Sequence, residues 1–129
     1  MSLREITVLT DIALITCIVQ RGVADAIIQA AREAGAQGAT VHFASGMGVR
    51  ERLGILGVAV EVEKEVIDIV VSKEQVERVF ERMYLAGNLD TPGMGIMYIT
   101  SLEKAATFIP PDVLGKFSVD KDKKDQEKS

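Results

Sequence analysis

The stretch Val66-Ile67-Asp68-Ile69-Val70-Val71, which reads VIDIVV, decides the fold. Five of its six residues are β-branched, and this composition favours a strand. We predict that a helix follows, because Ser72-Lys73-Glu74-Gln75 has the spacing of a capping box and Gly87 is placed to end the helix. Apolar residues between these signals recur at helical spacing, at Val76, Val79, Phe80 and Met83. The β-forming run Ile96–Thr100 then predicts a second strand.

The first half of the sequence repeats this order of strand, helix and strand. Ala13–Gln20 is a β-branched run, a helix is predicted between Gly22 and Gly35, and Ala39–Ala44 is the second strand. The apolar positions of that helix are Val23, Ile27, Ala30, Ala31 and Ala34. Two such units in tandem predict an α+β fold of the ferredoxin-like split β-α-β type (βαββαβ), a four-stranded antiparallel sheet with two helices on one face.

Both sides of the predicted strands are apolar over residues 14–19 and 66–71, except at Thr16 and Asp68. One layer of helices covers only one face, and large exposed apolar patches are rare on monomers. We therefore predict a homo-oligomer. The alternative is that Ile6–Thr10 or Leu102–Pro111 folds back over the second face.

Length and composition exclude several classes of protein. A chain of 129 residues, 47% hydrophobic and 26% charged, is one soluble domain. A net charge of -4 argues against nucleic acid as a partner, and no apolar run is long enough to insert into a membrane. One cysteine and one histidine cannot form a disulfide or a zinc site, and Met1–Glu5 lacks the order of a signal peptide, so we expect a cytoplasmic protein.

The chain is predicted to divide into one domain, residues 1–115, and a tail, residues 116–129. The tail reads KFSVDKDKKDQEKS, in which nine of fourteen residues are charged. This composition predicts disorder and a solubilising role, with a basic docking tail as the alternative.

Two glycine-rich segments are candidates for binding a ligand. The segment Ser45–Glu63 is longer than a hairpin turn, and Gly46-Met47-Gly48 can place successive backbone amides around an anion. Asp90-Thr91-Pro92-Gly93-Met94-Gly95 is a second glycine-spaced turn, just before the last strand. As a pair, the two segments suggest a cleft lined by amides if subunits pack strand against strand; separately, each is an ordinary turn.

No catalytic or metal-binding set is found in the sequence. A lone strand histidine, His42, is more often packed or hydrogen-bonded than catalytic, and Cys17 has no basic neighbour in sequence that would lower its pKa. We expect Cys17 to be a small core residue.

Four separated stretches resemble the PII nitrogen regulatory signalling proteins, in order and register. They are Ala36–Val41, Ser45–Gly48, Lys64–Val71 and Gly93–Gly95, and the resemblance runs from about Ile12 to Pro110. It implies a homotrimer with small ligands in three clefts between neighbours. It also implies a T-loop, at about residues 46–63, that docks on a target enzyme or membrane transporter.

The resemblance also has departures. Ile96 stands where the family has a lysine that holds nucleotide phosphates, and the family's arginines after the last strand are missing from Glu103–Phe108. Lys64 matches the family's lysine near the end of the T-loop. The effector is therefore expected to be AMP, ADP or ATP with weaker or altered binding, or another small anion, and a mono- or diphosphate is favoured.

The leading hypothesis is a non-catalytic regulator that binds a small anionic effector. The expected ligand-binding residues are Thr40, Gly46, Met47, Gly48, Lys64, Gly93, Met94 and Gly95. Arg50, Glu51 and Arg52 are expected to face the partner, and valine at Gly48 or Gly95 to abolish ligand binding without breaking the trimer. The alternative is a small ferredoxin-like enzyme of acylphosphatase type, for which the sequence offers only Arg21 after the first strand.

Overall fold

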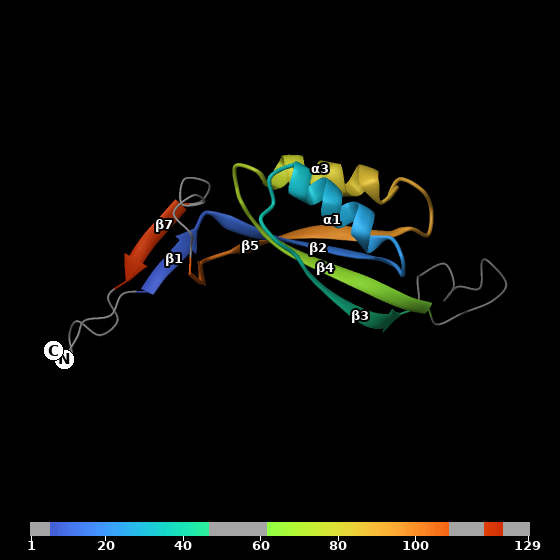
Figure 1. Ribbon diagram of the computed structural model, residues 1–129, viewed down its shortest axis with the longest axis horizontal. Helices are drawn as coiled ribbons and strands as arrows, with labels where there is room; N and C mark the ends of the chain where they lie inside the picture. Colours follow the sequence, from blue (N-terminus) through green and yellow to red (C-terminus); the bar gives the residue numbers. More distant parts are fainter. Residues whose placement is uncertain (1–5, 47–61, 109–117, 123–129) are drawn as a thin grey trace.

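The main body of the protein is a four-stranded antiparallel sheet with two helices on one face (Figure 1). The computed structural model describes residues 6–46, 62–108 and 118–122. The strand order is β3-β4-β2-β5, which confirms the predicted ferredoxin-like arrangement. The elements of this body are β2 (Ile12–Gln20), α1 (Ala24–Glu33), β3 (Thr40–Gly46), β4 (Val62–Ser72), α3 (Val76–Ala86) and β5 (Gly95–Leu102).

The core lies between the helices and the sheet. Alternate residues of β2 and β4 point to this side, because successive side chains of a strand face opposite ways. The buried residues are Ala13, Ile15, Cys17 and Val19 of β2, Ile67, Ile69 and Val71 of β4, Ala24, Ile27 and Ala31 of α1, and Val76, Val79 and Met83 of α3. Except for Ala30, the predicted apolar positions of both helices therefore belong to this core or pack against it.

The two helices pack closely on each other at Gly87, which follows α3. A Cβ atom at Gly87 would lie 2.8 Å from Cδ1 of Ile27 on α1, so a side chain here would displace the end of the Ile27 side chain. Gly35 ends α1 with a φ of +116°, a conformation that glycine adopts at no steric cost. Both glycines end their helices as the sequence predicts.

The predicted capping box at the start of α3 is wrong. The N-cap residue is Gln75, with no side-chain cap, and α3 begins at Val76. Ser72 is instead the last residue of β4, paired with Ile12, and its hydroxyl is buried without a hydrogen-bond partner in the part of the chain that the structure describes. Strand pairing continues to Ser72, and its side chain is buried without bonding to an amide of the helix.

The face of the four-stranded sheet opposite the helices, here called the open face, is not covered by the described residues. Ile96, Tyr98 and Val70 are 59%, 44% and 37% exposed. Near the middle of this face, Thr16 Oγ1 donates a hydrogen bond to Asp68 Oδ1 at 2.8 Å, and His42 Nε2 lies 3.4 Å from Asp68 Oδ2. The two polar exceptions in the sequence pattern are thus hydrogen-bonded to each other.

A second, three-stranded sheet is formed by β1 (Ile6–Thr10), β6 (Ala105–Ala106) and β7 (Ser118–Asp122), in the order β6-β1-β7. Leu9 pairs with Ala105 in the same register as Ile12 with Leu102, so this sheet continues the β2–β5 pairing beyond Asp11, whose φ is +53°. Figure 1 shows this sheet projecting from the main body. The alternative in which residues 6–10 fold back over the open face is therefore wrong.

The expectation of a disordered tail is wrong for residues 118–122. These residues form β7, which pairs with β1 over five residue pairs despite the charged composition. β7 pairs with the edge of β1 that lies opposite β6, and backbone pairing with an edge does not require apolar side chains. Among the described residues, no helix is both long and apolar enough to cross a membrane.

Candidate functional site

Three of the elements meet at one end of the open face, around Lys64. In the sheet register Lys64 lies opposite Gln20 of β2 on one side and Ala44 of β3 on the other. The Gln20 side chain donates a hydrogen bond from Nε2 to the carbonyl oxygen of Gly93 at 3.0 Å. We call the group Lys64, Gln20 and Gly93 the Lys64 end. It brings the predicted lysine and the predicted glycine turn to the same place within one chain.

The other predicted ligand-binding residues are not all at this end. Gly46 is there, since it pairs with Val62 just before Lys64. Thr40 lies opposite Asp68, four residues before Ala44 and so about 13 Å further along the edge strand β3. The two edge strands, β3 and β5, are separated by two strands, about 14 Å across the sheet. Met47, Gly48, Arg50, Glu51 and Arg52 lie outside the described residues.

The turn before β5 depends on its glycines in two different ways. Gly93 has a φ of +84° and open space around the position of a Cβ, so its role is the shape of the turn. At Gly95, a Cβ would lie 2.3 Å from the carbonyl oxygen of Ile18. Valine at Gly95 is therefore expected to disturb the pairing of β5 with β2, contrary to the expectation that it leaves the trimer intact. Met94, between them, is half-buried.

Ile96 lies on the open face opposite Ile18 and is one of its most exposed apolar side chains. It supplies no charge to the Lys64 end. Any anion bound there is therefore neutralised by Lys64 or by cations from elsewhere.

The two neighbours of Lys64 in sequence, Glu63 and Glu65, have partners that the sequence did not predict. Glu63 Oε1 accepts a hydrogen bond from Arg21 Nη1 at 2.7 Å, and both side chains are exposed. Glu65 Oε1 accepts from the backbone N–H groups of Gly22 and Ala24, at 2.8 and 3.1 Å, and so satisfies the first amide of α1 and one amide of the turn before it. The alternation of the strand indicates which face these carboxylates lie on, since residues 63 and 65 share a strand face with the core residue Ile67. The partner of each carboxylate, however, is over forty residues away.

The described residues do not form a catalytic centre of a known type. Cys17 is fully buried, and burial raises the pKa of its thiol to about 12, so it is not a nucleophile. His42 contacts Asp68, as expected for a hydrogen-bonded strand histidine. Among these residues, no three His, Cys, Asp or Glu side chains gather to hold a metal ion.

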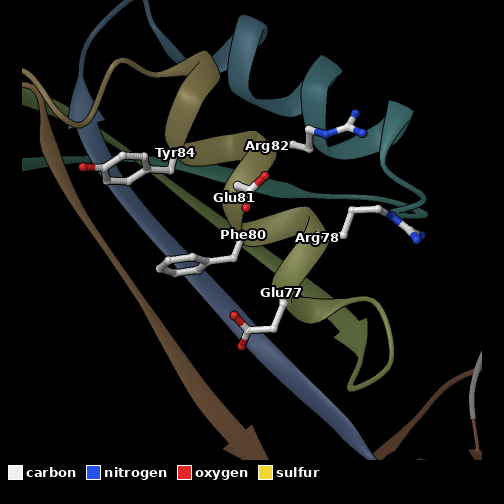
Figure 2. Close-up of a pocket in the computed structure, with 6 residues that line it drawn as sticks. All are labelled: Glu77, Arg78, Phe80, Glu81, Arg82 and Tyr84. Carbon is white, nitrogen blue, oxygen red and sulfur yellow. The ribbon is translucent and has the colours of Figure 1, made fainter.

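A hollow lined by residues of α3 does not bring polar groups together. Figure 2 shows Phe80 and Tyr84 pointing to one side of α3 and Arg78 and Arg82 to the other, so these side chains diverge. Arg78 Nε also donates to the carbonyl oxygen of Ala34 at 2.9 Å, which ties α3 to the end of α1. This role is structural.

Comparisons with known proteins agree with the fold. A family model described as "Nitrogen regulatory protein P-II" matches residues 12–109, a span that leaves out β1 and β7. Among solved structures, PII of Arabidopsis thaliana, bound to citrate, is similar with a TM-score of 0.56 and 22% identity. The alignment covers 73% of this chain and 79% of that chain, and it shows the fold. A comparison with curated proteins found no match.

Proposed function

Because the chain belongs to the nitrogen regulatory protein P-II family, we propose that it is a non-catalytic signalling protein that binds a small anionic effector at the Lys64 end. The effector class is a nucleoside mono- or diphosphate or an anion of similar size. Of the expected ligand-binding residues, one chain places Lys64, Gly46 and the Gly93–Gly95 turn at this end of the sheet.

The observation that carries this proposal is the row Lys64–Gln20–Gly93. Lys64 brings a positive charge to a half-buried position, and within the described residues it forms no ion pair. The Gln20 amide orients the Gly93 turn beside it through the 3.0 Å hydrogen bond. An ammonium group one strand away from a glycine turn, at the same end of the sheet, fits an anion of modest charge. A single lysine does not neutralise a triphosphate, so ADP or AMP is favoured over ATP.

The rest of the site is proposed to come from a second copy of the chain. Thr40 and the Gly93–Gly95 turn lie on opposite edges of one sheet, so one chain cannot bring them together. The exposed apolar side chains of the open face favour burial against other copies. We propose a homotrimer in which each effector cleft lies between two neighbours.

The output of the protein is proposed to run through residues 47–61, which join β3 to β4. Arg50, Glu51 and Arg52 would contact a target enzyme or membrane transporter in the cytoplasm, and the effector would change the affinity for that target. No nucleic acid, resident cofactor or metal is required.

The test begins with a thermal-shift screen of AMP, ADP, ATP, cyclic nucleotides, 2-oxoglutarate, citrate and bicarbonate. Calorimetry then compares Lys64→Gln with Lys73→Gln, a matched change of an exposed lysine just past the far end of β4. Loss of one charge-assisted contact is expected to weaken ADP binding about tenfold in Lys64→Gln only. Equal affinity in both variants would place the site elsewhere.

The acylphosphatase alternative is less well supported. It needs a free guanidinium after the first strand of the fold, and Arg21 is paired with Glu63 at 2.7 Å. We expect no hydrolysis of acyl phosphates above the rate of the buffer.

A further inference from the structure

The beginning of β4 extends past the end of its neighbour β2. The last residue pair between these strands is Gln20 with Lys64. Val62 and Glu63 continue β4 and pair only with Gly46 and Ser45 of the edge strand β3. On the β2 side, therefore, sheet pairing does not hold the residues that lead into Lys64.

Side-chain contacts add to the pairing at its end, from Glu65, which still pairs with Val19, and from Glu63, which lies just past the last pair. Glu63 is bound to Arg21 Nη1 at 2.7 Å, and Glu65 accepts from two backbone amides, those of Gly22 and Ala24. Arg21 and Gly22 lie in the turn between β2 and α1, and Ala24 is the first residue of α1. Glu63 and Glu65 thus fasten the start of β4 to this turn, on the side of the sheet that carries the helices.

Lys64 lies between these two carboxylates in the sequence. The face of the sheet on which its side chain lies is therefore opposite to theirs. Successive side chains of a strand alternate between faces, so fixing Glu63 and Glu65 on the helix side holds Lys64 on the open face. A shift of one residue would reverse all three and turn two carboxylates toward the anion. The register of this short segment therefore decides the sign of the charge at the Lys64 end.

We propose that Glu65, together with the Arg21–Glu63 ion pair, forms a set of positioning residues that hold Lys64 toward the effector. None of these three side chains needs to touch the ligand. The inference rests on the proposed function, because it assumes that Lys64 contacts the anion, and it adds which residues set the strength of that contact.

The test is a double-mutant cycle measured by calorimetry with ADP on the full chain. We expect Lys64→Gln to weaken binding about tenfold and Glu65→Ala about fivefold. The double variant should bind about as weakly as Lys64→Gln alone, because Glu65 acts through Lys64. Glu65→Gln keeps an oxygen that accepts from both amides and should restore most of the affinity. Glu81→Ala, an exposed glutamate of α3, is the matched control.

The outcomes separate the two proposals. If ADP does not bind the unmodified chain, or if Lys64→Gln binds it normally, the proposed function fails and the inference with it. If Lys64→Gln weakens binding but Glu65→Ala does not, or if the two losses multiply to about fiftyfold, only the positioning role is overturned. Melting curves of each variant show whether the chain is folded, and an unfolded Glu65→Ala leaves the decision to Arg21→Gln in the same cycle.

Discussion

Gly95 starts the edge strand β5 at a point where the chain has no room for a side chain. A Cβ there would lie 2.3 Å from the Ile18 carbonyl oxygen and 3.1 Å from Cα of Val19, and both of these are backbone atoms. Gly95→Ala is expected to lower the free energy of unfolding by about 3 kcal/mol, because backbone has to move. Urea denaturation measures this loss.

The control is Gly38→Ala, where the added Cβ has no neighbour within 4 Å. This variant should stay within about 0.5 kcal/mol of the parent. If both alanine variants are equally stable, β5 does not approach β2 as closely as described here.

Ser72 separates two accounts of the start of α3. As a helix cap its hydroxyl would stabilise the protein, and Ser72→Ala would cost about 1 kcal/mol. As a buried hydroxyl without a described partner it contributes a desolvation penalty instead. We expect Ser72→Ala to be neutral or to stabilise by up to about 1 kcal/mol in urea denaturation. A clear loss of stability would restore the capping role.

At the scale of elements, β7 protects the edge of β1. All five residues of β1 pair with β7, whereas only two pair with β6. Removal of residues 116–129 should therefore speed hydrogen exchange at the amides of Ile6–Thr10, with little change in Ile12–Gln20. Mass spectrometry of exchanged peptides measures both segments.

Removal of residues 123–129 alone is the matched control, because it keeps β7. This shorter deletion should leave exchange in Ile6–Thr10 as it is in the full chain. Equal protection in both deletions would mean that β7 contributes nothing to the order of β1.

The spacing of apolar residues in the sequence correctly predicted both helices. The helical spacing of Ile27 and Ala31, and of Val79 and Met83, was enough to place α1 and α3. The prediction of a capping box was wrong because Ser72 is still part of β4, where it pairs with Ile12. The strand β7 was missed because its pairing with β1 is a backbone interaction between the two ends of the chain, to which the charged side chains give no signal.

The candidate site was less predictable than the fold, because its contacts depend on strand register and on residues far apart in the sequence. Lys64 and Gly93 were named from the sequence, but their link through Gln20 depends on strand register. The Glu65 contacts with the start of α1 join residues over forty positions apart, and composition alone does not indicate them. Thr40 was grouped with the glycine turn although the strand order separates them within one chain.

At the scale of the whole molecule, the open face is the surface on which the proposed association between copies depends. Its exposed side chains Ile96, Tyr98 and Val70 surround the hydrogen-bonded pair Thr16–Asp68. Apolar surface favours association, and a polar pair within it favours one way of associating over others. Contact between copies is also what the proposed cleft requires, since one chain holds only part of it.

The most direct measurement of this account is the mass in solution by light scattering at micromolar concentration. The account predicts a trimer of about 42 kDa from chains of 14.0 kDa. Ile96→Glu, which places a charge on the open face, should dissociate it, and Phe108→Glu, an equally drastic change of an 83% exposed residue outside the four-stranded sheet, should not. A 14 kDa particle for the unmodified chain would contradict the account, because no second copy would then be present to complete the effector cleft.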